Sequence, residues 1–166
     1  MIKLIACIDN NKAIGKDGKL LYHLAEDMQY FKKLTAEKLF NAVIMGRKTA
    51  ESLPDGKPLK NRLNMVVSKS FSDKGFNCYK RLCDALYDAG KIKSIDTWII
   101  GGGQIYKEAI EKAIPEMLYI TKVEATSKDA DTFFPEFEDK YELCEKSEVH
   151  DNGTYRYTFN VYKRKG

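Results

Sequence analysis

Apolar residues along the chain gather in short continuous runs separated by polar turns. Residues 2–8 (IKLIACI), 42–46 (AVIMG), 63–68 (LNMVVS), 97–100 (TWII) and 118–125 (LYITKVEA) are the clearest runs. Runs of this length, bounded by turn residues, predict buried strands. Because they are continuous rather than alternating, they favour a parallel sheet that is covered on both faces.

Segments with helical spacing lie between these runs. Residues 24–35, 81–89 and 104–113 each place apolar side chains three and four positions apart. The segment RKTAESL continues as a helix directly after Gly46, and Gly90 is expected to end the third helix. The alternation of strands and helices predicts an α/β fold.

The remaining segments are expected to be turns and a closing hairpin. Residues 9–19 (DNNKAIGKDGK) carry Asn, Asp and Gly and are read as turns, and 78–79 as a short strand. The segment 151–153 (DNG) is a hairpin signal. Apolar residues alternate over 155–161, which predicts a half-buried antiparallel strand added at the edge of the sheet.

Length and composition limit the class of protein. A chain of 166 residues suits one domain, 1–166, and no apolar run reaches the 18 residues of a membrane span. The N-terminus lacks a secretory signal, so we expect a cytoplasmic protein. The four cysteines form no CxxC pair and the two histidines lie far apart, so no metal site is expected. The net charge of +4 is too small to indicate nucleic acid, but it fits an anionic small molecule.

The first candidate site is the segment Gly46-Arg47-Lys48-Thr49. A glycine at a strand end lets a ligand approach the backbone, and a helix N-terminus with basic side chains suits a phosphate. The spacing is not that of a Walker A loop, because Asn41 stands where the upstream glycine belongs. A basic turn that merely caps a helix is the alternative.

The second candidate site is the segment Ile100-Gly101-Gly102-Gly103. Three glycines after a buried strand leave room for a flat ring or a pyrophosphate against the backbone. The pattern is not the dinucleotide fingerprint, because Tyr106 stands where the last glycine would be. A flexible turn is the alternative.

Two charged residues are further candidates. Asp27 falls beside Leu24, Met28 and Phe31 on the apolar side of its helix. A carboxylate there is unfavourable unless it is paired, so it suits a ligand with N–H donors. The alternative is stabilisation by the helix dipole, for which the solvent-facing Glu26 is the better candidate.

Arg62 precedes the strand 63–68 and suits a bidentate pair with a substrate carboxylate. A surface charge is the alternative.

Taken together, these segments resemble the dihydrofolate reductase family over nearly the whole chain. The resemblance rests on six segments in the family's order and spacing, which are IGKDGKLLYHLAEDMQYFKKLT, AVIMGRKTAESL, PLKNRLNMVVS, IIGGGQIYKEAI, LYITKV and DADTFFP. It implies a three-layer fold with a mostly parallel sheet of about eight strands, an antiparallel C-terminal hairpin and about four helices. It also implies NADPH-dependent reduction of 7,8-dihydrofolate to tetrahydrofolate by a monomer.

The resemblance also implies roles for individual residues. Asp27 matches the acid that hydrogen-bonds the pterin and promotes protonation at N5, Thr121 supports it, and Arg62 binds the glutamate carboxylate. The other substrate positions that the resemblance implies are Ile5, Cys7, Met28, Phe31, Lys32, Leu53, Leu59 and Ile100. The implied cofactor positions are Ala6, Cys7, Ile14, Gly46, Arg47, Lys48, Thr49, Ser68, Lys69, Ile100, Gly101, Gly102, Gly103, Gln104, Ile105 and Tyr106. Arg47, Ser68 and Lys69 fall where the family holds the adenosine 2′-phosphate, and Gly101-Gly102 where it has a cis peptide.

The chain departs from the family pattern beside the expected pocket. Leu21-Tyr22 replaces a usual Pro-Trp, Ala25 replaces a common proline, and Cys7 stands where alanine is usual. In the family that tryptophan helps shape the pterin pocket and holds an ordered water, so the resemblance implies a catalytic role for Tyr22 beside Asp27 and Thr121. Tyr22 keeps a ring and a polar tip, so we expect activity to survive. Loss of the proline should loosen the loop that closes the site. Antifolate inhibitors are therefore expected to bind atypically.

Two other functions fit parts of the sequence. A related reductase of riboflavin synthesis shares the fold, a glycine turn and NADPH, but Asp27, Phe31 and Arg62 argue against it. A folate- or nucleotide-binding protein without turnover, or one that binds RNA, is the second. No arginine-rich or stacked aromatic surface supports RNA.

Overall fold

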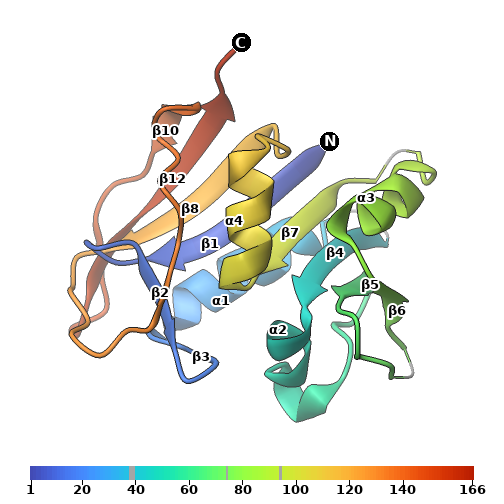
Figure 1. Ribbon diagram of the computed structural model, residues 1–166. Helices are drawn as coiled ribbons and strands as arrows, with labels where there is room; N and C mark the ends of the chain where they lie inside the picture. The colour runs from blue at the N-terminus through green and yellow to red at the C-terminus, as the bar shows by residue number, and fades with distance from the viewer. Residues whose placement is uncertain (38–39, 74, 94) are drawn as a thin grey trace.

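The central feature of the computed structural model is a nine-stranded mixed sheet (Figure 1). The structure describes residues 1–37, 40–73, 75–93 and 95–166. Eight strands follow one another across the sheet in the order β10 (Tyr141–Lys146), β12 (Arg156–Arg164), β8 (Met117–Val123), β1 (Ile2–Ile8), β7 (Thr97–Gly101), β4 (Asn41–Gly46), β5 (Arg62–Val67) and β6 (Asn77–Tyr79). The ninth, β11 (His150–Asp151), pairs with β12.

Six neighbouring strands, from β8 to β6, run parallel to one another. Their carboxyl ends therefore meet at one edge of the sheet, where ligands of such sheets bind. The predicted strands 2–8, 42–46, 63–68, 97–100 and 118–125 are confirmed to within two residues.

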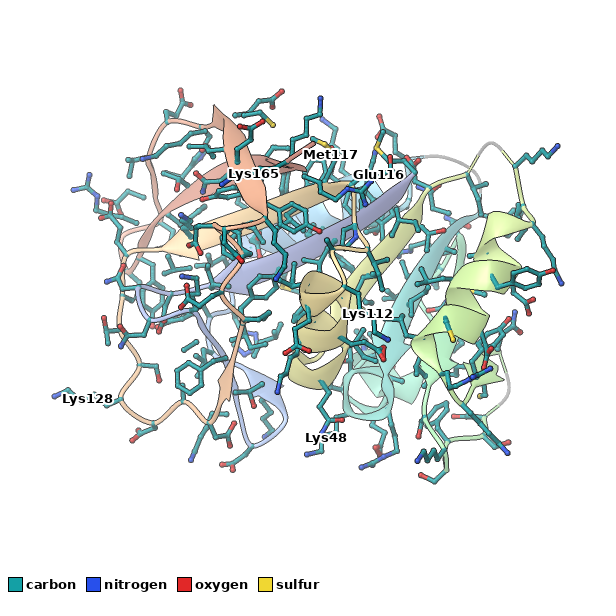
Figure 2. All side chains as sticks on the ribbon, turned by 45° about the horizontal axis from the view of Figure 1, so that its top comes forward. Lys48, Lys112, Glu116, Met117, Lys128 and Lys165 are labelled. Carbon is teal, nitrogen blue, oxygen red and sulfur yellow. The ribbon has the colours of Figure 1, made fainter. Side chains whose placement is uncertain are left out.

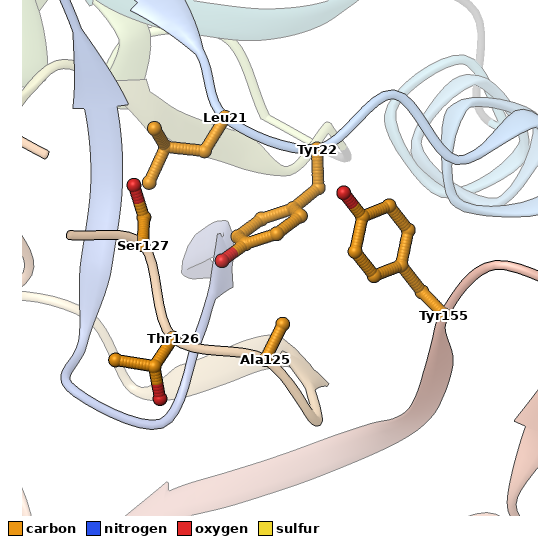
Figure 3. Close-up of a pocket in the computed structure, with 6 residues that line it drawn as sticks. All are labelled: Leu21, Tyr22, Ala125, Thr126, Ser127 and Tyr155. Atoms are coloured by element: carbon orange, nitrogen blue, oxygen red, sulfur yellow. The ribbon is translucent and has the colours of Figure 1, made fainter. Parts of the chain in front are cut away.

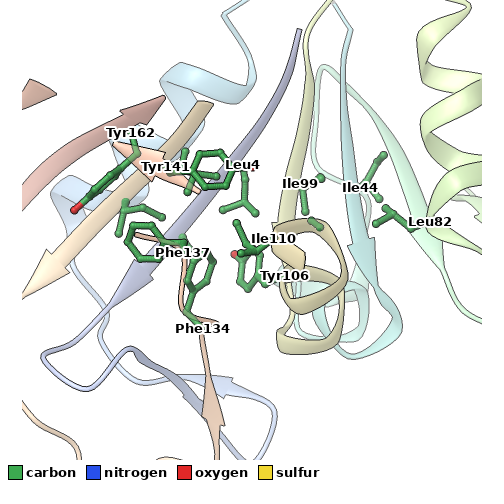
Figure 4. Packing of buried hydrophobic residues seen from close by; sticks show 14 of the residues in the cluster. Leu4, Ile44, Leu82, Ile99, Tyr106, Ile110, Phe134, Phe137, Tyr141 and Tyr162 are labelled. Atoms are coloured by element: carbon green, nitrogen blue, oxygen red, sulfur yellow. The ribbon is translucent and has the colours of Figure 1, made fainter. Parts of the chain in front are cut away.

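Helices cover both faces of the sheet. The helices are α1 (Ala25–Thr35), α2 (Arg47–Glu51), α3 (Leu82–Gly90) and α4 (Gly103–Glu111), with a 3-10 turn η1 (Pro54–Gly56). α3 and α4 pack on one face over Leu4, Ile44 and Ile99 (Figure 4). On the other face, Phe31 of α1 and Ala50 of α2 pack over Val43 and Trp98. The expected three-layer α/β architecture is confirmed.

The reading of residues 9–19 as turns alone was wrong. β2 (Ala13–Lys16) pairs with β3 (Lys19–Leu20) and with β9 (Thr132–Phe133) in a small separate sheet. Asp17 and Gly18 join β2 to β3 with φ values of 51° and 75°. An Asp-Gly turn of this kind matches the twist of a hairpin, so the same dipeptide that indicates a turn also favours two short strands around it.

The C-terminal strand lies inside the sheet, and not at its edge as expected. The hairpin at 151–153 is confirmed, since β11 pairs with β12. β12 then lies between β8 and β10, so both of its long sides are paired. Thr158 and Asn160, the polar positions of the alternating pattern, are buried, and Asn160 Nδ2 donates to the carbonyls of Ile120 and Thr158.

The chain's single tryptophan, Trp98, lies in the middle of the sheet. Its side chain is 1% exposed, and its ring centroid is 5.1 Å from that of Tyr119. The ammonium group of Lys3 lies 5.2 Å from the Trp98 ring and 3.0 Å from Asp96 Oδ2. Within the described part of the chain, the indole N–H has no hydrogen-bond acceptor.

Candidate active site

A carboxylate and a hydroxyl meet between α1 and the carboxyl end of β8. Asp27 lies in the first turn of α1, and Thr121 of β8 is paired in register with Cys7 of β1. The hydroxyl of Thr121, which is 1% exposed, donates to Asp27 Oδ1 at 2.5 Å. Burial raises the pKa of the Asp27 carboxyl, and the hydrogen bond from Thr121 opposes this rise. The group is thus set up to hold a proton more readily than an exposed aspartate.

Other titratable groups surround Asp27 and remain protonated at neutral pH. Burial raises the pKa values of Cys7 and Tyr106, and the negative charge of Asp27 raises them further. Burial raises the pKa of Tyr30 to about 12, and burial together with the hydrogen bond to Glu26 raises that of Tyr157 to about 12, with Asp27 adding to both shifts. These four groups therefore stay neutral, whereas Asp27 can carry a charge.

The apolar substrate positions converge on one side of the sheet. Five of them belong to the cluster around Val43 and Trp98, namely Ile5, Phe31, Leu53, Leu59 and Ile100. Cys7 lies on the same side of β1 as Ile5, because the two are two positions apart in the strand. Met28 is 60% exposed, and Lys32 is exposed and lines a pocket along α1 with Gln29, Lys33 and Ala36. Those two positions therefore lie at the rim.

Arg62 is held in a fixed orientation at the start of β5. Its Nη1 donates to Thr35 Oγ1 and its Nε donates to the carbonyl of Lys60, each at 2.9 Å. Thr35 is fully buried and donates its own hydroxyl proton to the carbonyl of Phe31. Burial lowers the pKa of the half-buried Arg62 guanidinium, which nevertheless stays charged. Its remaining N–H groups suit a carboxylate partner.

The two glycine junctions lie against each other at the carboxyl ends of β4 and β7. A Cβ on Gly46 would be 3.9 Å from the backbone nitrogen of Gly102, and a Cβ on Gly102 would be 3.4 Å from Thr49 Oγ1. Gly46 and Gly102 are the N-cap residues of α2 and α4, and glycine has no side chain to cap a helix. The first N–H groups of α2 and α4 therefore have no side-chain cap and are available to an anion. The peptide bond Gly101–Gly102 is cis, as the resemblance implied.

Other cofactor positions surround these glycines. Ala6, Ile14 and Tyr106 are buried in the cluster under α4, and Ile105 packs against it. The hydroxyl of Tyr106 lies 2.7 Å from the carbonyl of Ile5 and 2.8 Å from that of Ile100. Gln104 is exposed.

The basic positions lie outside the glycine turn, toward solvent. Lys48 and Lys69 are exposed, and Lys48 projects from α2 (Figure 2). Arg47 forms an ion pair with Glu51. Ser68 Oγ accepts a hydrogen bond from the Ser70 N–H. An incoming phosphate would therefore compete with Glu51 for Arg47, whereas the two lysines are exposed cations.

Comparison with known proteins decides the family. A family model described as dihydrofolate reductase matches residues 1–164. Similar proteins named dihydrofolate reductase include one from Bacillus subtilis, 36% identical over 99% of this chain and 95% of its own. Those from Gallus gallus and Sus scrofa are 35% and 34% identical, over 96% and 98% of this chain and 94% and 97% of theirs. The chain belongs to the dihydrofolate reductase family. It is therefore an oxidoreductase.

Among the described residues, no group of three or more His, Cys, Asp or Glu side chains is arranged to hold a metal ion. No described helix combines the length and the hydropathy that crossing a bilayer requires.

Sequence analysis missed one strongly bonded residue of the site. Asp9 follows β1 directly, is 4% exposed, and accepts four hydrogen bonds, of which one comes from the Tyr22 hydroxyl. Its place among Asn and Lys in a polar segment gave no signal of burial. Tyr22, expected to shape the substrate pocket, thus points its hydroxyl at Asp9.

Two further residues near the site, Tyr119 and Thr35, could have been predicted from their positions in the sequence. Tyr119 lies two positions before Thr121 in β8, which places it on the same face of the sheet. Thr35, which orients Arg62, ends the predicted helix 24–35, where a hydroxyl can bond back to the carbonyl four residues earlier.

The expectation that Glu26 only faces solvent and the helix dipole was incomplete. Its Oε1 accepts a hydrogen bond from the Tyr157 hydroxyl and lies 2.8 Å from His150 Nδ1. The rings of His150 and Tyr157 stack with centroids 5.6 Å apart. Glu26 therefore ties the first turn of α1 to the C-terminal hairpin.

Removing the Thr121 hydroxyl should raise the pKa of Asp27 further. In Thr121→Val the buried carboxylate loses the donor that favours its charged form, while the side-chain shape is kept. Titration of the Asp27 side-chain carboxyl carbon by NMR measures the change. Thr121→Ser, which keeps the hydroxyl, is the matched control and should titrate close to the unmodified protein. An unchanged midpoint in Thr121→Val would contradict the role given to this hydrogen bond.

Proposed function

We propose that the protein reduces 7,8-dihydrofolate to 5,6,7,8-tetrahydrofolate with NADPH, by hydride transfer from nicotinamide C4 to pterin C6 and protonation at N5. The observation that carries this proposal is the paired Asp27 and Thr121 at the carboxyl end of the sheet. A partly buried carboxylate beside an apolar cluster suits the amino and ring N–H donors of a pterin. The glycine junctions open toward the same edge.

On the substrate side, the apolar cluster and Arg62 support binding of a folate at two points. Ile5, Phe31 and Ile100 offer flat apolar contacts for the pterin and benzoyl rings. Arg62, fixed by Thr35 and Lys60, suits the glutamate carboxylate by a bidentate pair. Asp27, at the opposite end of α1 from Thr35, would orient the pterin, and Met28 and Lys32 would contact the substrate from the rim.

Asp27 would act by orientation and by holding negative charge close to the pterin. Its raised pKa, caused by burial, lets the carboxyl gain a proton more readily than an exposed aspartate does. Hydrogen bonds from the substrate to Oδ2 leave Oδ1 to Thr121. The carboxylate thereby favours a pterin that carries a proton at N5, and the proton itself comes from water.

On the cofactor side, the residues present fit a dinucleotide phosphate. NADPH, when bound, supplies the hydride, and the protein supplies binding and orientation. The open N-termini of α2 and α4, with Thr49 between them, suit the pyrophosphate. Because Gly101 and Gly102 have no side chains, the nicotinamide end of the cofactor could approach the backbone there. Arg47, Ser68 and Lys69 would distinguish NADPH from NADH by pairing with the 2′-phosphate.

We infer that residues 1–166 form one domain, which works as a monomer in the cytoplasm. Its product would serve one-carbon metabolism, including thymidylate, purine, methionine and glycine synthesis. A related reductase acting on a phosphoribosyl pyrimidine has no need of both Asp27 and Arg62, so these two residues favour dihydrofolate.

The experiment is loss of NADPH absorbance at 340 nm with dihydrofolate, compared with NADH. Rapid oxidation of NADPH, at least about tenfold more efficient than that of NADH, is expected from the 2′-phosphate contacts. If the folded protein binds NADPH but does not oxidise it with dihydrofolate, the proposal is wrong. The phosphoribosyl pyrimidine substrate would then be tried.

Changing Arg62 should weaken substrate binding with little effect on cofactor binding. Arg62→Leu removes the guanidinium that would pair with the glutamate carboxylate, and the Michaelis constant for dihydrofolate should rise about 10- to 100-fold, as for a lost charge-assisted pair. Arg62→Lys keeps the charge but not the two-pronged geometry, so it should recover only part of the loss. Dihydrofolate kinetics that are unchanged in Arg62→Leu would exclude this contact.

A further inference from the structure

Asp9 connects three segments that lie far apart in the sequence. Its Oδ1 accepts the N–H groups of Asn11 and Ala13, and its Oδ2 accepts the Tyr22 hydroxyl and the Ser127 N–H, each at 2.9 Å. The carboxylate thus joins the end of β1 to the segment before α1 and to the loop after β8. Burial raises the pKa of Asp9, but these four bonds outweigh it and hold the pKa below the ordinary value. Asp9 is therefore charged and fully engaged at neutral pH.

Tyr22 is the part of this arrangement that the chain does not share with the family pattern, which has tryptophan there. Figure 3 shows its ring between Tyr155 on one side and Ala125 and Ser127 on the other. Tyr22 lines a pocket of about 210 Å³. The Tyr22 and Tyr155 rings meet edge to face with centroids 5.1 Å apart. The ring is thus held by packing, and its hydroxyl fixes the loop to Asp9.

The three joined segments each lead directly to the polar pair of the site. Tyr22 precedes Leu24, the N-cap of α1, and Asp27 lies in the first turn of that helix. Ser127 follows β8, which carries Thr121. Asp9 follows β1, in which Cys7 is paired with Thr121 and interacts electrostatically with both Asp27 and Asp9. A shift of the segment at Tyr22 would therefore move α1 relative to β8.

We propose that Asp9 is a positioning residue, which through the Tyr22 hydroxyl and the Ser127 N–H fixes α1 against β8 and so sets the burial of Asp27. Tyr22 is the donor that makes this connection, in place of the tryptophan of the family pattern. The consequence for dihydrofolate turnover rests on the proposed function. The consequence for Asp27 itself does not.

The experiment compares two matched variants that each remove one phenol hydroxyl from the same pocket. Tyr22→Phe removes the donor to Asp9, whereas Tyr155→Phe removes a hydroxyl that makes no hydrogen bond with the described residues. The Asp27 carboxyl carbon is titrated by NMR in the full-length protein. In Tyr22→Phe we expect the midpoint to fall by about half a pH unit, because loosened packing admits water to Asp27. In Tyr155→Phe the titration midpoint of Asp27 should be unchanged.

A double variant tests whether Tyr22 acts through Asp9. Asp9→Asn removes a charge as well as an acceptor, so it is used only as a background. Tyr22→Phe should shift the Asp27 midpoint in the unmodified protein but not in Asp9→Asn. An equal shift in both backgrounds, or no shift in either, would overturn the proposal.

Hydrogen exchange of the Ser127 amide and turnover of dihydrofolate give two further tests of the role of Asp9. Hydrogen exchange of the Ser127 amide should be slow in the unmodified protein and faster in Tyr22→Phe, and fast exchange in both would overturn the proposal even if a variant folds poorly. Turnover of dihydrofolate should fall about tenfold in Tyr22→Phe, as for one lost hydrogen bond to a charged group, and its pH profile should move with the Asp27 midpoint. If the unmodified protein has no reductase activity, the proposed function fails while the NMR midpoint still decides the role of Asp9.

Discussion

Asp27→Asn is expected to lower the rate of dihydrofolate reduction about 10²- to 10⁴-fold, the range for loss of a positioned acid or base. Asparagine has nearly the same shape and can still accept the Thr121 hydroxyl, but it cannot carry charge. The assay is NADPH oxidation at 340 nm across pH. Activity of the variant should recover in part at low pH, because acid protonates the substrate without help from the enzyme.

The same change should make the folded protein more stable at neutral pH. Because burial raises the pKa of Asp27 in the folded state, the protonated form is favoured by folding, and that stability is present at low pH and lost as the pH rises through the folded pKa. Asparagine avoids this loss, so the melting temperature of the variant relative to the unmodified protein should rise between pH 4 and pH 8. A variant with full activity and an unchanged pH dependence would exclude Asp27 as the proton-linked group.

Gly101→Ala is expected to be the most damaging change at the cofactor side. The backbone of Gly101 has a φ of 129°, which L residues rarely adopt, and an added Cβ would lie 3.2 Å from Tyr106 Oη and 3.5 Å from Thr49 Oγ1. Backbone strain alone should lower the free energy of unfolding by about 1–3 kcal/mol. Displacement of Tyr106 would disturb the carbonyls of Ile5 and Ile100 to which its hydroxyl lies close.

Chemical denaturation and NADPH titration measure the two effects of Gly101→Ala. We expect the affinity for NADPH to fall at least about tenfold, because the side chain enters the space beside the backbone that the cofactor would use. Gly90→Ala is the matched control, since a Cβ there meets nothing within 4 Å and the residue lies in helix α3. It should be neutral or stabilising by up to about 1 kcal/mol. Equal behaviour of the two variants would contradict the role of the glycine turn.

The parallel core was predictable because its strands are buried on both faces. Val43 and Ile44 have no exposed surface although they point to opposite sides of β4, so the sequence there is continuously apolar. The two-residue strands β3, β9 and β11 are too short to show such a pattern. β3 and β11 each pair with the adjacent strand of the chain across a turn, whereas β9 pairs with the distant β2.

The candidate site was predictable where a residue conflicts with its surroundings. Asp27 on an apolar helix side and three glycines after a strand break local rules, and such conflicts mark functional positions. Asp9 breaks no rule, because a polar residue in a polar segment looks the same whether it is exposed or fully bonded. Its place became visible only with the donors from Tyr22 and Ser127, which are 13 and 118 positions away.

Because Trp98 is the single tryptophan of the chain, it is an intrinsic fluorescence probe of folding and binding. As the one indole of the chain lies 1% exposed, with no acceptor for its N–H among the described residues, its fluorescence should be blue-shifted in the folded state and move to the red on unfolding. Trp98 belongs to the same apolar cluster as Phe31 and Ile100. Emission from Trp98 should therefore change when a ligand binds against this cluster, without an added dye.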